Sequence, residues 1–217
     1  MVGMDEFEVE SRVYGHPSPY TASPVFDRAC LNAMRAGCID PERGGLTCRI
    51  PLDEAIDTTP MEFNDSESGS LRVWEKPVKD EQYIVSVDTA AGLQSKDFSC
   101  ATVLKVARKE GTTYLEMVAQ FHDHLTMLSY SEEVFKLGVW YNSALIVVEL
   151  TGGYGRSIME RLRSGADGIG LAYWNIFRDN RSVEYAEFGR QPKFGVDTSA
   201  HNKAGMISNL QHYIKNN

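Results

Sequence analysis

The chain has 217 residues, and its 42% hydrophobic and 24% charged residues are typical of globular proteins, which excludes collagen-like, coiled-coil and fully disordered chains. No apolar run reaches the roughly 18 residues that a membrane span needs, and the acidic first ten residues lack the basic start of a signal peptide; we therefore expect a cytoplasmic protein without a membrane partner. Residues 1–70 carry 5 Lys and Arg against 13 Asp and Glu, which accounts for the whole net charge of −8, so the balanced remainder is compatible with a polyanionic partner.

Residues 1–70 show no sustained hydrophobic periodicity and are predicted to form an acidic linker or connector segment. Within it, the spacing of apolar residues in Phe26 to Arg35 predicts a short helix. The four cysteines of the chain have neither CxxC spacing nor paired histidines. We therefore expect reduced thiols rather than a zinc site or a disulfide framework.

From Leu71 onward the sequence shows apolar runs and a regular alternation of apolar and polar residues. This change predicts that residues 71–217 form a folded domain. Three strands joined by short connections come first and predict an antiparallel meander: Gln82–Asp88, Ser99–Ala107 and Thr113–Phe121.

Helices and strands alternate after the meander. In chain order these are a helix through Tyr130 and Trp140, a strand at Ala144–Val148, a helix opened by Gly152 and Gly153, a strand at Leu171–Phe177, and a helix from about Ser199 to Ile214. The order β-β-β-α-β-α-β-α predicts an α/β fold of the ribonuclease H-like kind. In this arrangement a mixed five-stranded sheet is flanked by helices.

Two carboxylates end predicted apolar strands. Asp88 and Glu149 are each followed by small residues, and no Lys or Arg lies within three positions of either. Each could be an ordinary turn residue, but a carboxylate beside a core strand is costly unless it is paired or bound to a cation. Because hard cations take oxygen ligands, the two acids together favour a Mg²⁺ site.

Asp97 lies nine residues after Asp88, where the predicted hairpin returns, so it is expected to face Asp88 or to serve as a turn residue. The run His122-Asp123-His124 ends a predicted strand. Side chains alternate along a strand, so Asp123 is expected on the opposite face from the two histidines, and we assign all three to surface or packing roles.

The ordered combination of these motifs resembles the nuclease domain of the phage terminase large subunit, the DNA-packaging motor protein. The similar segments are IVSVDTAAGLQSKDFSCATVL, YNSALIVVELTGGYG and FGVDTSAHNKAGMISNL. The shared features are a strand ending in Asp, a second Asp followed by an aromatic residue and Ser, Tyr-Asn before a strand ending in Glu, and Thr…Lys before a helix; here they are Asp88, Asp97-Phe98-Ser99, Tyr141-Asn142, Glu149 and Thr198…Lys203.

The resemblance implies a metal-dependent endonuclease that cuts double-stranded concatemeric DNA during packaging in the host cell cytoplasm, with the portal protein and the small terminase subunit as partners. It implies two Mg²⁺ or Mn²⁺ ions. Asp88 and Glu149 would bind them, and Asp97 would orient a water. Contacts to the DNA backbone would come from Arg156, Lys193 and Lys203, although each is also consistent with solvated surface charge.

The chain also departs from this family. Thr151 and Val196 stand where Asn and Trp are common, and the family's last metal-binding acid would follow beyond Asn217. Asp197 could substitute for that acid as a metal ligand. We therefore expect a C-terminally incomplete nuclease domain of weak or no activity, without the GxxxxGK[ST] motif of the family's ATPase.

Three other interpretations use the same residues. A non-cleaving docking module of the packaging motor would keep the fold but lack a complete metal site. A junction resolvase would share the sheet and the acids but does not usually have a long acidic front segment. The loop after Asp88 also resembles the phosphate loop of actin-like ATPases, a fold that needs a second such loop and a second similar domain.

Overall fold

The computed structural model describes residues 25–52, 54–56, 58–90, 97–163, 171–179 and 193–216. The chain divides into two compact units. The terminal unit consists of Met1–Cys38 and Lys203–Asn217, and the sheet unit spans Ile39–Asn202. In the described residues no helix combines the length and the apolar character needed to cross a membrane.

The terminal unit contains helix α2 (Arg28–Ala36) and most of helix α5 (Ala200–Asn216), so the helices expected near these positions are confirmed. Asp27 begins α2 because its carboxylate accepts a hydrogen bond from the backbone N–H of Cys30 at 2.9 Å. This bond lowers the pKa of Asp27.

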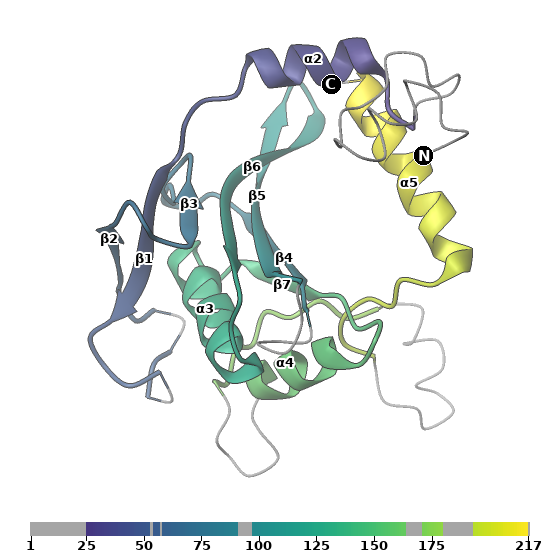
Figure 1. Cartoon of the computed structure of the whole chain (residues 1–217). Coiled ribbons are helices and arrows are strands. Elements are labelled where there is room, and N and C mark those ends of the chain that lie inside the picture. Colours follow the sequence, from purple (N-terminus) through teal and green to yellow (C-terminus); the bar gives the residue numbers. More distant parts are fainter. Residues whose placement is uncertain are drawn as a thin grey trace, which may run out of the picture. The chain divides into compact units, whose positions relative to one another are not determined.

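The sheet unit is built on one seven-stranded sheet with the order β2-β1-β3-β6-β5-β4-β7 (Figure 1). Its strands are β1 (Glu42–Cys48), β2 (Met61–Asp65), β3 (Leu71–Val73), β4 (Tyr83–Asp88), β5 (Ser99–Lys109), β6 (Thr112–Asp123) and β7 (Leu145–Val148). Every neighbouring pair is antiparallel except β4 and β7, which are parallel. The expected α/β architecture and the β4–β5–β6 meander are confirmed.

The expected count of five strands is wrong. Three further strands, β1, β2 and β3, extend the sheet beyond β6, and β1 and β2 lie within the segment that the sequence suggested as a connector. These strands are short or rich in glycine, so their own sequences favour the extended state only weakly. They are held by pairing and by the burial of Leu46, Met61, Leu71 and Val73.

The strand expected at Leu171–Phe177 does not form as a regular strand of the sheet. Ile176 makes only an isolated parallel bridge to Ile146. Ala172 adopts a positive φ of 48°, which interrupts an extended chain. The backbone N–H of Tyr173 donates at 2.6 Å to the carbonyl of Leu162 instead of to a strand.

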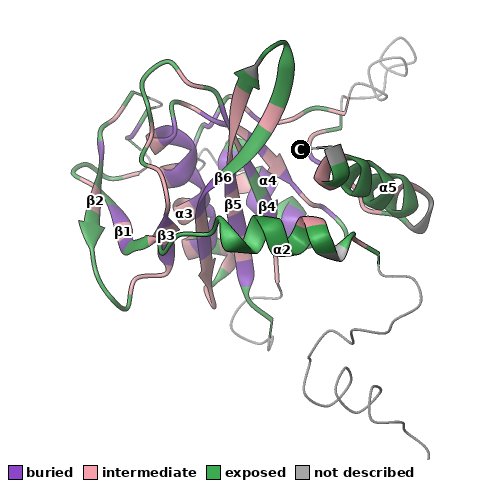
Figure 2. Cartoon of the chain, turned by 90° about the horizontal axis from the view of Figure 1, so that it is seen from above, coloured by how far each residue is buried: buried purple, intermediate pink, exposed green. Residues whose placement is uncertain are grey.

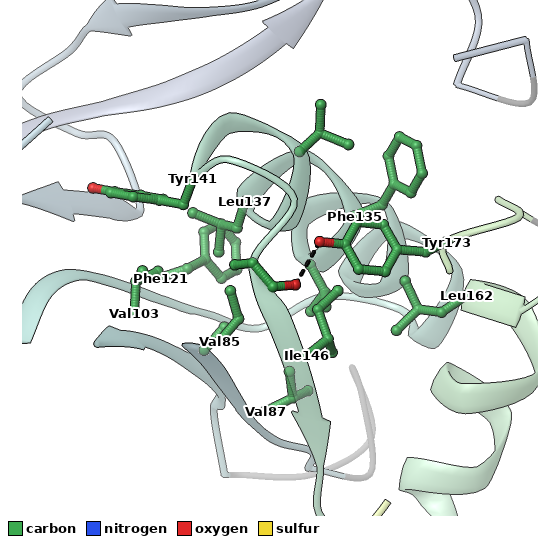
Figure 3. Packing of buried hydrophobic residues seen from close by; sticks show 14 of the residues in the cluster. Val85, Val87, Val103, Phe121, Phe135, Leu137, Tyr141, Ile146, Leu162 and Tyr173 are labelled. Atoms are coloured by element: carbon green, nitrogen blue, oxygen red, sulfur yellow. Dashed lines mark hydrogen bonds between the residues drawn. The ribbon is translucent and has the colours of Figure 1, made fainter. Parts of the chain in front are cut away.

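The core lies between one face of the sheet and two helices, α3 (Met127–Trp140) and α4 (Tyr154–Arg163) (Figures 1 and 2). Val85 and Val87 of β4 are fully buried there, whereas Ser86 and Asp88, which alternate with them, are exposed. The hydroxyl of Tyr173 donates at 2.6 Å to the carbonyl of Ala144 within this core (Figure 3). The alternation along β4 therefore places the side chains of Ser86 and Asp88 on the face away from α3.

Candidate active site

Asp88 and Glu149 lie at the ends of neighbouring strands. Val87 of β4 pairs with Val148 of β7 in a parallel register, and the N–H of Glu149 donates to the carbonyl of Val87 at 3.0 Å. Parallel strands are about 4.8 Å apart, so the next residue on each strand, Asp88 and Glu149, meets the other at one edge. Because Val87 and Val148 point into the core, both carboxylates belong to the opposite face.

The carboxylate of Glu149 is fixed by backbone donors. One oxygen accepts from the N–H of Thr151 at 3.0 Å and the other from the N–H of Thr198 at 3.3 Å. Burial alone would raise the pKa of Glu149, but these hydrogen bonds outweigh burial and lower it. Glu149 is therefore a pre-oriented carboxylate that is ionised at neutral pH.

Thr151 and Thr198 also bind one another. The N–H of Thr198 donates to the hydroxyl of Thr151 at 2.9 Å, and that hydroxyl donates to the carbonyl of Thr198 at 3.1 Å. Val196 forms a parallel bridge with Glu149, which holds this segment beside the end of β7. Sequence reasoning missed the positioning role of both threonines, because the two contacts join segments 47 residues apart.

The end of β4 is held from the helix side. Tyr130 of α3 is fully buried, and its hydroxyl donates to the carbonyl of Asp88 at 3.2 Å. Burial raises the pKa of Tyr130 well above its usual value, so the phenol stays a neutral donor. The next residue, Thr89, has a buried hydroxyl without a hydrogen-bond partner among the described residues. An unpartnered hydroxyl beside a carboxylate is a place where a water or a ligand oxygen is favoured.

The substitution Tyr130→Phe should lower the free energy of unfolding by about 1 kcal/mol, because it removes the hydrogen bond from the phenol to the Asp88 carbonyl. Urea unfolding measures this change. Tyr114→Phe is the matched control, since Tyr114 is half-buried in β6 and the same atom is removed. Equal losses in both variants would contradict a specific role for Tyr130 at the end of β4.

Asp97 lies at the same end of the sheet. Cys100 of β5 pairs with Asp88, and Asp97 is three residues before Cys100 on an exposed stretch. The hydroxyl of Ser99 accepts from the N–H of Ala90 at 3.2 Å, which ties the two sides of this hairpin together. The described residues nevertheless contain no group of three or more His, Cys, Asp or Glu side chains arranged to hold a metal ion. The structure thus juxtaposes Asp88 and Glu149, and in the part of the chain that it describes no third acid is assembled with them.

An aromatic cluster, which the sequence analysis did not identify, adjoins Asp97. Phe98 is 51% exposed, and its ring lies 4.4 Å from the ring of His122 and 3.9 Å from that of His124. Asp123 turns away from them and accepts a hydrogen bond from the hydroxyl of Ser70. The alternation expected for this run is therefore observed, and the histidines pack against Phe98.

Asp197 lies near Glu149 but is engaged elsewhere. Its carboxylate forms an ion pair with Lys193, four residues earlier, and its backbone carbonyl accepts from the side chain of Asn202 at 2.7 Å. Lys193 is thus partly neutralised. Arg156 is exposed in the first turn of α4, and Lys203 is exposed in α5, in the terminal unit.

Comparisons with known proteins do not show a family for this chain. No protein-family model matches the chain, and no curated protein matches it. One similar solved structure is the large terminase nuclease from the thermophilic phage G20c with bound magnesium, with a TM-score of 0.39 and 17% sequence identity over 69% of this chain. The match covers 62% of the solved chain, so this chain spans less than two thirds of its length. The structural likeness is weak.

Proposed function

We propose that this chain is a metal-dependent phosphodiesterase that cuts double-stranded DNA, as the nuclease part of a viral packaging terminase. The observation that carries the proposal is the meeting of Asp88 and Glu149 at the ends of two parallel strands, on the face away from the helices. The resemblance of the motifs around these residues supplies the reaction class.

The donor set fits a hard divalent cation. Mg²⁺ is usually held by one or two carboxylates, with water and substrate phosphate completing its octahedral shell. Glu149 is ionised and fixed, Asp88 is exposed, and the hydroxyl of Thr89 has no hydrogen-bond partner among the described residues. Mg²⁺ or Mn²⁺, as one or two ions, would supply charge stabilisation for the transferring phosphoryl group.

The residues of the chain have separate tasks in this proposal. Asp88 and Glu149 hold the cation and set the position of the scissile phosphate. The backbone donors from Thr151 and Thr198 keep Glu149 from rotating, which lowers the cost of ordering it when substrate binds. Asp97, at the exposed start of the returning strand, orients a water for attack.

The biological setting is part of the same proposal. A packaging nuclease acts on concatemeric DNA in the host cell cytoplasm and works with a portal protein and a small terminase subunit. Of the DNA-contacting residues expected from the sequence, Arg156 is exposed in the first turn of α4, in the same compact unit as Asp88 and Glu149.

Isothermal titration with Mn²⁺ tests the metal site. The unsubstituted chain should bind, and Asp88→Asn should weaken binding at least about tenfold, because a neutral amide replaces one of two charged ligands. Asp80→Asn is the matched control, since Asp80 is an exposed acid at the other end of β4. Equal binding by Asp88→Asn and the unsubstituted chain would overturn the proposal.

A non-cleaving docking module is the second candidate. It is favoured by the absence of a third assembled acid in the described residues and by the ion pair that occupies Asp197. A chain that binds Mn²⁺ but leaves plasmid DNA intact would favour this function over the nuclease.

A further inference from the structure

Two arginines share one aromatic ring beside the candidate active site. The guanidinium carbon of Arg163 lies 3.9 Å from the centre of the Phe194 ring, and that of Arg178 lies 4.9 Å from it. Arg163 is the last residue of α4, and Arg178 forms an antiparallel bridge with Phe194 itself. Both arginines are exposed, whereas Phe194 is half-buried against the core.

The backbone around the ring is well connected. The N–H of Gly195 donates to the carbonyl of Phe177 at 2.9 Å, and the N–H of Asp179 donates to the carbonyl of Lys193 at 2.9 Å. Phe194 is therefore fixed between the end of α4 and residues 177–179. The guanidinium groups are anchored by a ring that is itself anchored, and this lowers the entropy that they lose on binding a ligand.

The two positive charges are not neutralised by described acidic residues. Neither Arg163 nor Arg178 forms a salt bridge to a described residue, and the ring distances place their guanidinium carbons no more than about 9 Å apart. Like charges held this close repel each other. An anion between or across them would relieve the repulsion and would use the guanidinium donors that the ring leaves free.

The position of the ring relates this arginine pair to the acids. Val196 bridges to Glu149, and Phe194 is two residues before Val196. Two residues span at most about 7 Å of chain, and Gly195 between them has a positive φ of 79°, so the backbone of Phe194 lies within that distance of Val196. A phosphate on the arginine pair would lie outside the Asp88–Glu149 edge, farther away by the length of the side chains, and a few nucleotides of DNA backbone would connect the two sites.

We infer that Arg163 and Arg178, stacked on Phe194, form a binding site for backbone phosphate of DNA. The site guides the strand toward the Asp88–Glu149 edge and reads no sequence, because it contacts phosphate oxygens only. This inference rests on the proposed function for the identity of the polyanion as DNA. It adds two backbone contacts that the sequence did not indicate.

The experiment measures binding of a fluorescein-labelled DNA duplex by anisotropy in EDTA, over a series of NaCl concentrations. Each contact between a cationic side chain and a phosphate makes the plot of log K against the logarithm of the salt concentration steeper by about 0.9. The double variant Arg163→Gln/Arg178→Gln should therefore bind more weakly at low salt, with a slope shallower by about 2. Arg108→Gln/Lys79→Gln removes the same charge from exposed positions away from the carboxyl ends of β4 and β7, and its slope should stay close to that of the unsubstituted chain.

Further variants separate binding from structure. Phe194→Leu keeps both charges but removes the ring, so it should weaken DNA binding without abolishing it. Arg178→Gln alone, a single exposed change, should make the slope shallower by about 1 and serves if the double variant does not fold by circular dichroism. An unchanged slope in folded arginine variants, or an equal change in the Arg108 and Lys79 control, would overturn the inference.

The metal titration keeps the two proposals apart. Arg163→Gln/Arg178→Gln should bind Mn²⁺ as the unsubstituted chain does, because neither arginine contacts Asp88 or Glu149 in the described contacts. Loss of Mn²⁺ binding only in Asp88→Asn, with an unchanged salt slope in the arginine variants, supports the proposed function and overturns the phosphate site. Absence of Mn²⁺ binding in every variant, with a shallower slope in the arginine variants, overturns the metal site and supports the phosphate site.

Discussion

The substitution Asp88→Asn is expected to abolish Mn²⁺-dependent nicking of plasmid DNA, with a loss of at least about a hundredfold. Asn has nearly the shape of Asp but carries no charge. The cation therefore loses a charged ligand, and the scissile phosphate is no longer held in position for the reaction. Asp88 is exposed, so the free energy of unfolding should change by no more than about 0.5 kcal/mol. The effect is therefore on chemistry and not on folding.

Conversion of supercoiled to relaxed plasmid, followed over time on a gel, measures this loss. Asp80→Asn should nick at the rate of the unsubstituted chain, since the same change is made at the opposite end of β4. Nicking by Asp88→Asn at an undiminished rate would rule out the Asp88–Glu149 edge as the site of reaction. If the unsubstituted chain binds Mn²⁺ and nicks nothing, the docking module becomes the better description.

The pair at the edge could be predicted from the sequence because it depends on local rules. An apolar run that alternates with polar residues indicates a strand, and the residue after the run stands at the end of that strand. Asp88 and Glu149 both satisfy this rule. Their meeting needed one further fact, the parallel pairing of β4 with β7, which no local pattern of the sequence specifies.

The three added strands could not be predicted by the same rules. The sequence of β1, ERGGLTC, contains two adjacent glycines and only three residues of high strand propensity or hydrophobicity, and β3 has three residues. Their extended conformation is stabilised by long-range pairing, β1 with β3 and β3 with β6. Tertiary pairing overrides weak local preference here, and no window of the sequence contains that information.

The surroundings of the site were hidden for a related reason. The donors to Glu149, the ion pair on Asp197 and the two arginines on Phe194 come partly from irregular chain in residues 171–179 and 193–198. The sequence predicts a regular strand at Leu171–Phe177, whereas the structure has isolated bridges there. Where the expected secondary structure is wrong, the expected side-chain positions in and near it are wrong as well. The prediction of Lys193 as a DNA contact therefore did not include its ion pair with Asp197.

The largest effect on stability should come from Gly155→Ala. Gly155 is buried at the start of α4, where a Cβ atom would lie 1.9 Å from the carbonyl oxygen of Glu149 and 2.9 Å from its carbonyl carbon. Both atoms belong to the backbone and cannot rotate away. The helix must shift, at a cost of about 1–3 kcal/mol or more in the free energy of unfolding.

Urea unfolding gives the size and sign of this change, and the sign is informative. In a helix without such a contact, alanine stabilises relative to glycine by about 0.5–1 kcal/mol. Gly205→Ala in α5 is the matched control, since a Cβ there meets nothing within 4 Å, and it should stabilise the chain. Gly155→Ala should instead lower the urea midpoint and weaken Mn²⁺ binding, because the atom that it displaces belongs to Glu149. A stabilised Gly155→Ala variant with full Mn²⁺ affinity would show that α4 does not rest on the end of β7 and does not set the position of that carboxylate.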